Sequence, residues 1–320
     1  MLRIGVIGAG GNGVGHARYY RDCPRSEVAA VADPDTARAE ALAAECGADA
    51  LSDYAEMLDG VDAVVVSSPN YLHREHAVGA AQAGCHVYCE KPMGLSAAEA
   101  DEIADAVRDA GVRSAVGFSV RFGAALQTMQ RYVREGRAGR LLSLWARRMS
   151  FLDPARWPAW RQDHALSGGV LLEINVHELD WLMALGGEVR SVYARTWAEG
   201  QDAPRANDHN WVVLNFEGGA VGTHEGSQVS PVPVYERAAI GTEGGLQTTD
   251  WGNGLCYAAR GQKTAPVELD APFDLRGHFL DCIEEGIPCV ADVEWGRKVM
   301  RVAEAVLASA RTGQVQHLMP

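Results

Sequence analysis

The first third of the chain alternates short apolar runs with alanine-rich segments of helical composition. Each run is bounded by Gly, Pro, Asp or Ser, as buried strands commonly are. The five runs lie within residues 3–10, 27–35, 62–69, 85–92 and 113–120. Strands that alternate with helices are typical of a parallel sheet covered by helices on both faces. We therefore predict an α/β domain in this part of the chain.

The pattern changes after residue 120. A helix is predicted near residues 123–136, and the later apolar runs follow one another without helices between them. The runs lie at residues 140–151, 189–200, 211–229 and 234–249. Successive strands predict a C-terminal α/β domain with an open, largely antiparallel mixed sheet. A last helix is predicted near residues 293–313, with Gly313 as its C-cap. We place the two domains at residues 1–120 and 121–320.

Composition and charge narrow the class of ligand. A length of 320 residues, with 47% hydrophobic and 22% charged, is typical of a soluble protein with two domains. The net charge of −13 argues against nucleic acid or an anionic membrane as a partner. No apolar run reaches about 18 residues, and the N-terminus enters a predicted strand without the features of a signal peptide. We therefore expect a cytoplasmic protein that binds a small, largely uncharged molecule.

The cysteines give no sign of a metal site or a disulfide framework. They are odd in number and lack paired C-x-x-C spacing, which is typical of reduced thiols with a structural role. The seven are Cys23, Cys46, Cys85, Cys89, Cys256, Cys282 and Cys289. The pair His177-Glu178 resembles the start of an H-E-x-x-H zinc motif, but the second histidine is missing. We expect no metal.

A glycine-rich turn follows the first predicted strand directly. Residues 8–13 read GAGGNG, and a helix is predicted from near Asn12. Such glycines allow a tight turn and let the backbone approach a pyrophosphate, while the helix N-terminus supplies N–H groups. Asp33 ends the second strand, where a carboxylate binds a ribose diol and repels a 2′-phosphate. The turn predicts a Rossmann dinucleotide-binding domain with NAD favoured over NADP. The expected contacts are Gly8, Gly10, Gly11, Asn12, Gly13 and Asp33.

Polar residues interrupt an apolar helical segment at residues 168–181. Glu173, His177 and Asp180 recur at helical spacing, so neighbouring side chains of this polar stripe can meet. Buried polar groups are costly unless each one finds a partner or a ligand. The opposite stripe is apolar and is expected to pack in the core; it contains Leu172, Val176, Leu179 and Met183. The segment is therefore a candidate for a substrate-facing helix.

Several motifs along the chain carry a family resemblance. They are Ser68-Pro69-Asn70 with His73 and His76, Glu90-Lys91-Pro92, residues 117–122, Trp160-Arg161, residues 167–180, and residues 278–286 with 310–315. Together they resemble the Gfo/Idh/MocA oxidoreductases, the glucose-fructose oxidoreductase and inositol dehydrogenase group. The resemblance spans nearly the whole chain. It implies a Rossmann domain that carries the cofactor, a second α/β domain, and a substrate bound between the two.

The resemblance also assigns roles to single residues. Lys91 and His177 match the family's residues that face the nicotinamide and the substrate, whereas Glu173 stands where the family usually has Asp, and Asn175 where it has Gly. Oxidation of a secondary alcohol needs a group that removes the hydroxyl proton, and an imidazole is suited to that role. Glu173 would orient this imidazole, and Lys91 would stabilise the developing alkoxide.

The remaining candidates have more than one interpretation. Cofactor contacts are expected from the loop residues Ser68, Pro69, Asn70 and His73 and from Glu90 with Lys91, while His76 is interpreted as structural. Glu90 has a second interpretation, as an ion-pair partner of Lys91 or a turn cap. Arg121, Trp160 and Arg161 are expected on the substrate side. An ion pair between the domains is the alternative for Arg121, and core packing is the alternative for the tryptophan. Asp180 is expected to support the helix.

Three functions fit the sequence. The leading hypothesis is an NAD-dependent oxidoreductase that oxidises a secondary alcohol of a sugar, cyclitol or related polyol. The second is a redox-neutral enzyme that modifies a glycoside with tightly bound NAD, which the unusual Glu173 favours slightly. The third is a non-catalytic protein that senses NAD or a sugar, against which Lys91 and His177 argue. We also expect a homodimer or homotetramer, because the second sheet would expose apolar residues such as Trp197, Trp211 and Val213.

Overall fold

The computed structural model describes residues 1–151, 156–197 and 209–318. The chain forms two compact units, each built from two separate segments. Unit 1 contains Met1–Gly117 and Leu275–Met300, and unit 2 contains Phe118–Asp274 and Arg301–Pro320.

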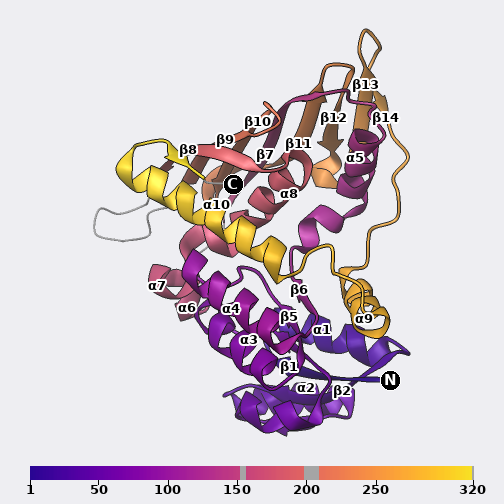
Figure 1. Ribbon diagram of the computed structural model, residues 1–320, viewed down its shortest axis with the longest axis vertical. Coiled ribbons are helices and arrows are strands. Elements are labelled where there is room, and N and C mark those ends of the chain that lie inside the picture. The colour runs from indigo at the N-terminus through magenta and orange to yellow at the C-terminus, as the bar shows by residue number, and fades with distance from the viewer. Residues whose placement is uncertain (152–155, 198–208, 319–320) are drawn as a thin grey trace. The chain divides into compact units, whose positions relative to one another are not determined.

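Unit 1 is built around a six-stranded sheet in which every strand pair is parallel. In sheet order the strands are β3 (Asp49–Leu51), β2 (Ser26–Ala32), β1 (Leu2–Ile7), β4 (Ala63–Val66), β5 (His86–Cys89) and β6 (Ser114–Val116). The helices between them are α1 (Gly11–Asp22), α2 (Thr36–Cys46), α3 (His73–Gln82) and α4 (Ala97–Ala110) (Figure 1). From the centre of the sheet the chain moves outward in one direction from β1 to β3, and in the other direction from β4 to β6. Because each crossover is right-handed, α1 and α2 lie on one face of the sheet and α3 and α4 on the other. The predicted doubly covered parallel sheet is confirmed.

A segment from late in the chain completes unit 1. It contains α9 (Leu275–Glu285) and the first part of α10 (Val293–Thr312). The backbone N–H of Val116, in the edge strand β6, donates to the carbonyl of Ala291 at 2.6 Å. Arg25, which precedes β2, pairs with Asp281 of α9 at 2.6 Å. Residues 275–300 are therefore an integral part of the first unit.

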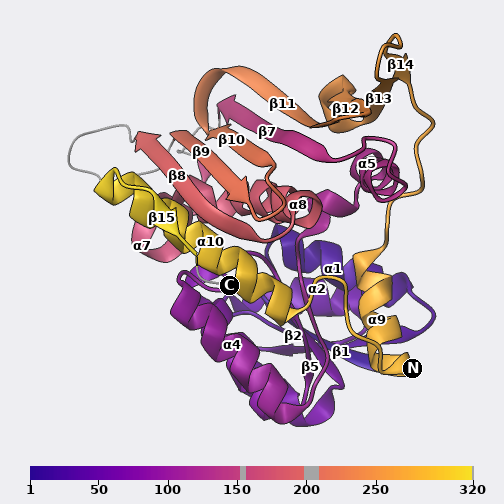
Figure 2. The same cartoon turned by 45° about the horizontal axis from the view of Figure 1, so that its top comes forward.

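Unit 2 contains an open nine-stranded sheet in which only β7 and β10 pair in parallel. Figure 2 shows the strands fanned out from β8 to β14. In sheet order they are β14 (Ala265–Pro266), β13 (Gly254–Ala259), β12 (Gly244–Thr249), β11 (Val229–Gly241), β7 (Leu141–Phe151), β10 (Val221–Ser227), β9 (His209–Phe216), β8 (Val189–Trp197) and β15 (Gln316–His317). The predicted open, largely antiparallel mixed sheet is confirmed. The last three residues of the run predicted at 189–200 lie outside the described residues.

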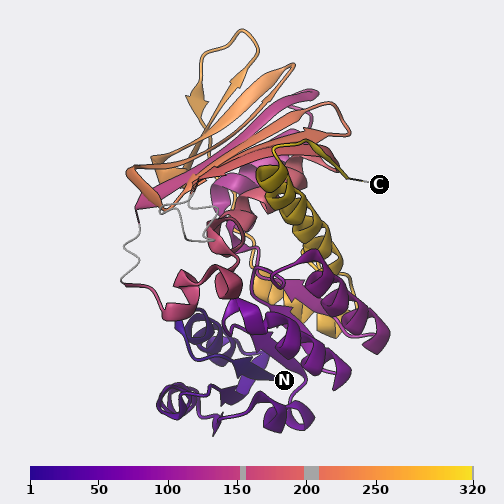
Figure 3. The same cartoon turned by 90° about the vertical axis from the view of Figure 1, so that its left-hand side faces the viewer.

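The two faces of this sheet differ in burial. Along β9 the buried side chains alternate with outward-facing ones such as Trp211, which is 45% exposed. Helix α8 (Val176–Gly186) and the C-terminal part of α10 lie on one face (Figure 3), and no helix in the described part of the chain lies on the other. The other helices of unit 2 are α5 (Ala124–Arg134), α6 (Ala159–Gln162) and α7 (His164–Ser167). Because successive side chains of a strand point to opposite faces of the sheet, every second residue lies on the uncovered face, which is partly apolar.

The longest described helix, α10, is amphipathic rather than uniformly apolar. Val302 and Val306 are buried on one side of it, whereas Arg301 and Glu304 are exposed. Among the described helices, none combines the length and the apolar character that a membrane crossing requires.

Candidate functional site

Two glycines of the first turn are fixed by close backbone packing. Gly8 has φ +97°, and a Cβ there would lie 2.7 Å from the carbonyl oxygen of Ser67. A Cβ on Gly13 would overlap the carbonyl oxygen of Gly8. A side chain at either position would push β1, α1 and the loop after β4 apart.

The other two glycines border open space. A Cβ on Gly10 or Gly11 would meet no atom within 4 Å. Gly10 is the N-cap of α1 and makes no side-chain capping bond, so the first N–H groups of this helix point to an exposed surface with Asn12 beside them. Helix α1 begins at Gly11, one residue before the predicted start. Bare backbone at a helix N-terminus fits a pyrophosphate, which satisfies such groups and the helix dipole.

Asp33 holds this turn beside the second strand. Its Oδ2 accepts a hydrogen bond from the N–H of Ala9 at 2.8 Å, and its Oδ1 accepts one from the N–H of Asp35 at 2.9 Å. A carboxylate has about four acceptor positions, so two remain for the hydroxyls of a ribose. Asp33 is half-buried directly after β2, which is where a dinucleotide-binding domain places its ribose ligand.

His73 and His76 organise the loop after β4. The ring nitrogens of His73 lie 2.7 Å from the carbonyl oxygen of Pro92 and 2.8 Å from that of Ser68. Burial lowers the pKa of His73, whereas the two carbonyl contacts favour the protonated ring, because a neutral imidazole donates to only one of them. His76 contacts the Ser68 hydroxyl at 2.8 Å, and Asn70 begins a buried turn directly after Pro69. The two histidines thus tie the loop 68–70 to the turn that follows β5.

The Glu90-Lys91-Pro92 turn follows β5, and its Lys91–Pro92 peptide is cis. Glu90 accepts a hydrogen bond from Nε2 of His16, on α1, at 2.8 Å. Burial opposes the charge on Glu90, but the bond from His16 and the nearby positive charges together outweigh it, so the pKa lies below its usual value. Gly117 is required here, because a Cβ would lie 2.8 Å from Oε1 of Glu90. The sequence analysis missed His16, since no motif connects it to the turn.

The segment predicted as one regular helix in unit 2 begins with a π-helical turn, Leu171–Asn175, that leads directly into α8. Such turns are rare and are frequently found at functional sites. The apolar stripe is buried, as expected. The segment contains more buried polar side chains than the three of the predicted stripe. The buried polar residues are Glu173, Asn175, His177, Glu178 and Asp180.

Two members of the stripe form ion pairs with arginines that were predicted on the substrate side. Nη2 of Arg161 lies 2.7 Å from Oε1 of Glu173, and Nε of Arg121 lies 3.2 Å from Oδ2 of Asp180. The Arg121 pair with Asp180 lies within unit 2. The Arg161 guanidinium lies 5.3 Å from the ring centroid of Trp160 and is partly exposed. The supporting role expected for Asp180 agrees with its burial and its pairing.

The other buried polar residues face the sheet. Glu178 pairs with Arg237 of β11 and lies 3.6 Å from Nη1 of Arg148 on β7. Oδ1 of Asn175 accepts a hydrogen bond from Asn210 of β9 at 3.3 Å. The expectation of a single polar stripe was therefore incomplete, because polar groups occupy more than one side of the segment.

His177 is 7% exposed and its ring centroid lies 6.4 Å from that of Phe118, edge to face. Phe118 is itself buried. The imidazole is therefore held by packing near the entry to α8, on the same segment as Glu173 but with Glu173 directed to Arg161. A packed aromatic neighbour restricts the ring to few orientations, as proton transfer requires.

The fold and the glycine turn define a nucleotide-binding α/β protein with a separate second unit, and comparison with known families gives the group. Residues 2–118 match the family described as "Oxidoreductase family, NAD-binding Rossmann fold", and residues 126–247 match the "GFO/IDH/MocA C-terminal domain". The chain belongs to this oxidoreductase family. The predicted family, fold class and NAD-binding Rossmann domain are thereby confirmed.

Individual relatives act on sugars and cyclitols. A scyllo-inositol 2-dehydrogenase (NAD(+)) of Bacillus subtilis is 29% identical over 92% of this chain and 90% of its own length. A D-xylose 1-dehydrogenase (NADP(+)) of Haloferax volcanii is 30% identical over 99% of this chain and 100% of its own. The crystal structure of an aldose-aldose oxidoreductase from Caulobacter crescentus, complexed with glycerol, is 25% identical with a TM-score of 0.90 and 99% coverage of both chains. Six other curated relatives are matched over 54 to 67% of their own length.

Proposed function

We propose that this protein is an NAD-dependent oxidoreductase that oxidises a secondary alcohol of a sugar, cyclitol or related polyol. The observation that carries the proposal is the bare cradle at Gly10 and Gly11 with the Asp33 carboxylate beside it. Relatives named as sugar and inositol dehydrogenases support the substrate class. NAD, when bound, supplies the hydride acceptor.

The chain's own residues would handle the proton and the charge. We propose His177 as the general base that takes the hydroxyl proton, because an imidazole is suited to proton transfer. We propose that Lys91 stabilises the negative charge that develops on the reacting oxygen. Glu173 is paired with Arg161, and we propose that this ion pair positions the segment that carries His177. Arg161 and Trp160 lie at the exposed end of this ion pair and are proposed to contact substrate hydroxyls and C–H surfaces.

An absorbance assay with a panel of sugars and cyclitols tests the proposal. Incubation with NAD and the correct polyol should produce NADH in proportion to turnover. Absence of NADH and of product across the panel, in protein shown to bind NAD, would leave only a sensing role.

A redox-neutral reaction is the second candidate function. It is supported by the solved structure of similar fold that is named an aldose-aldose oxidoreductase. In that case hydride returns to a second carbonyl and NAD stays bound. The same panel separates the two functions: product without free NADH identifies the redox-neutral enzyme, whereas accumulating NADH identifies the dehydrogenase.

Asp33 predicts a preference for NAD over NADP. The Asp33→Asn variant keeps one acceptor oxygen but loses the negative charge, so the ratio of the NAD and NADP affinities should fall by about 10- to 100-fold, as a lost charge-assisted hydrogen bond implies. Calorimetric titration of each cofactor measures the ratio. Asp35→Asn is the control, because Asp35 is exposed, pairs with Arg38 and caps α2. An unchanged ratio in Asp33→Asn, or tighter wild-type binding of NADP, would contradict this prediction.

The uncovered face of the second sheet supports the proposal of a homodimer or homotetramer. Trp197 and Trp211 are 50% and 45% exposed on neighbouring strands, with the half-buried Val213 beside them. A buried interface tryptophan commonly contributes 2 kcal/mol or more, so Trp211→Glu should weaken assembly by about 30-fold or more. Sedimentation velocity over a range of concentrations measures this. Trp251→Glu is the control, because Trp251 is exposed on a turn after β12. A wild-type protein that remains monomeric at all concentrations excludes the assembly.

A further inference from the structure

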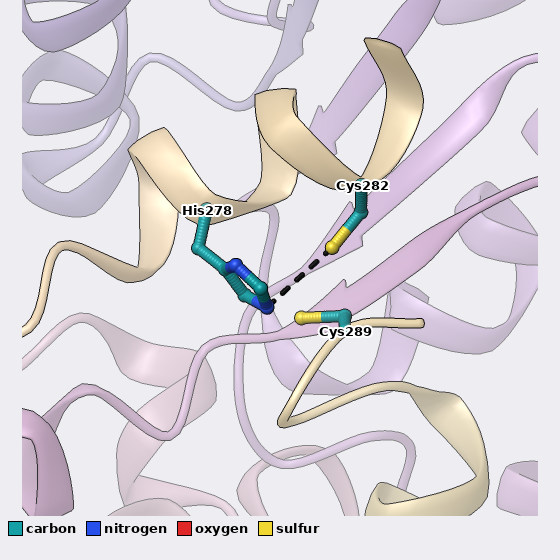
Figure 4. Close-up of side chains that lie close together, drawn as sticks. All are labelled: His278, Cys282 and Cys289. Carbon is teal, nitrogen blue, oxygen red and sulfur yellow. Dashed lines mark hydrogen bonds between the residues drawn. The ribbon is translucent and has the colours of Figure 1, made fainter. Parts of the chain in front are cut away.

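Unit 1 contains a cluster of soft metal-ligand side chains that the proposed oxidoreductase chemistry does not use. His278 and Cys282 lie one turn apart on α9, and Cys289 comes from the segment between α9 and α10 (Figure 4). Among the described residues, these three form a group whose ligand atoms all lie within 4.8 Å of one another. Both cysteines are buried and free of disulfides.

The spacing of the atoms is close to that of a tetrahedral metal centre. With Zn–S of about 2.3 Å and Zn–N of about 2.0 Å, a tetrahedron has S···N edges of about 3.5 Å and S···S edges of about 3.8 Å. Nε2 of His278 lies 3.5 Å from Sγ of Cys282. Small rotations of the Cys289 side chain are sufficient to bring the third atom into place, because it already lies within 4.8 Å of the other two.

The imidazole already presents the correct nitrogen. The N–H of Val290 donates to the lone pair of Nε2 of His278 at 3.3 Å, so a bound ion would replace this N–H as the partner of that nitrogen. Nδ1 lies 4.0 Å from Oδ2 of Asp281, beyond hydrogen-bond distance, so this carboxylate contributes negative charge near the ring and no hydrogen bond at this separation. The His278 side chain is 14% exposed, so an ion can reach the cluster from solvent.

The thiols are protonated when no metal is bound. Burial raises the pKa of Cys289 to about 12 and also raises the pKa of Cys282. Asp281 and Asp292 add negative charge nearby, which disfavours thiolates but attracts a cation, while Arg113 acts in the opposite sense. A divalent ion that binds here must therefore displace two protons.

We propose that His278, Cys282 and Cys289 form a binding site for a zinc-class metal ion, with one nitrogen and two sulfur ligands. Thiolate and imidazole ligands favour Zn²⁺ over Mg²⁺, Ca²⁺ and Mn²⁺, which prefer oxygen. Three protein ligands leave the fourth position to water or another small ligand. The ion joins the end of α9 to the segment that leads into α10.

Cobalt titration of the full-length protein tests this site directly. Protein that has been reduced and freed of metal with a chelator is titrated with Co²⁺ under anaerobic conditions. We expect one Co²⁺ per chain, a thiolate-to-cobalt charge-transfer band in the near ultraviolet, release of about two protons per ion, and displacement of the cobalt by Zn²⁺. The melting temperature should rise with added Zn²⁺, because the ion binds only the folded chain.

Three variants decide between this cluster and incidental binding. Loss of one thiolate in Cys289→Ser should remove most of the charge-transfer intensity and weaken Co²⁺ binding by at least about 100-fold, since even outer-shell changes cost about 10- to 100-fold. His278→Gln should also weaken binding, and it decides the matter if the buried serine variant does not fold. Cys85→Ser is the control, because Cys85 is a buried thiol of the same unit that contacts backbone carbonyls of Leu58 and Val61.

Three outcomes of the cobalt titration would contradict the metal site. Wild-type protein without a charge-transfer band has no thiolate metal site. A band that persists in both Cys289→Ser and His278→Gln, or that is lost in Cys85→Ser, places the ion elsewhere.

Discussion

Replacing His177 with alanine is expected to lower kcat by about 10²- to 10⁴-fold while leaving the affinity for NAD nearly unchanged. The loss corresponds to about 3 to 5 kcal/mol of transition-state stabilisation. The physical reason is that the variant has no positioned group to take the hydroxyl proton, whereas the glycine cradle and Asp33 are untouched. Steady-state kinetics together with calorimetric NAD binding separate the chemical step from cofactor binding.

The pH dependence distinguishes a base from a structural residue. Only neutral imidazole accepts a proton, so kcat in the oxidation direction should rise with pH in the wild type and lose this dependence in His177→Ala. Lys91→Ala should also lower kcat, because it removes the charge that stabilises the developing alkoxide. His224→Asn is the matched control, since His224 is a buried histidine of unit 2 whose Nδ1 contacts the Ala146 carbonyl at 3.0 Å. Wild-type turnover with an unchanged pH profile in His177→Ala would show that His177 has no catalytic role.

Arg237→Met is expected to lower the free energy of unfolding by about 3 to 5 kcal/mol. Arg237 and Glu178 are 1% and 0% exposed, so the variant leaves a carboxylate without its main partner in the interior. Burial opposes the charge on Arg237, but its interactions with Glu178 and Tyr235 together outweigh burial and raise the arginine pKa. Arg148, 3.6 Å from Glu178, compensates only part of the loss. Urea unfolding followed by circular dichroism measures the effect.

Two further variants test whether the buried charge itself is responsible. Glu178→Gln combined with Arg237→Met removes both charges and should recover part of the lost stability. Arg147→Met breaks the more exposed pair with Glu225 and should cost at most about 1 kcal/mol, because solvent screens such pairs. If Arg237→Met and Arg147→Met destabilise the protein equally, the buried pair contributes no more than a surface one.

Much of the fold was predictable because it depends on local patterns. Apolar runs identified β1, β2, β4, β5 and β6, and the glycine turn placed the start of α1 within one residue. Strand β3 was missed because it has three residues and little buried surface, so periodicity is not detectable in it. The mixed sheet of unit 2 followed from successive strands, whereas the parallel pairing of β7 with β10 depends on long-range contacts.

The candidate site was only partly predictable for the same reason. Spacing placed Glu173 and His177 on one segment, but it could not reveal a π-helical turn, which changes the angular position of each residue within the segment. The partners of the buried charges come from remote elements. Glu178 pairs with Arg237 of β11, 59 positions away, and Glu90 with His16, 74 positions away. No local pattern encodes such pairs.

The two segments of unit 1 are synthesised at different times, because unit 2 residues lie between them in the sequence. A ribosome releases residues 1–117 long before residues 275–300, which cover the edge strand β6 and pair with Arg25. At about 5 to 20 residues per second, the intervening segment takes on the order of 10 s or more to translate. Throughout that interval the nascent nucleotide-binding unit has an unpaired sheet edge, and unpaired edges are templates for aggregation. Chaperone protection of the growing chain is therefore most needed before α9 emerges.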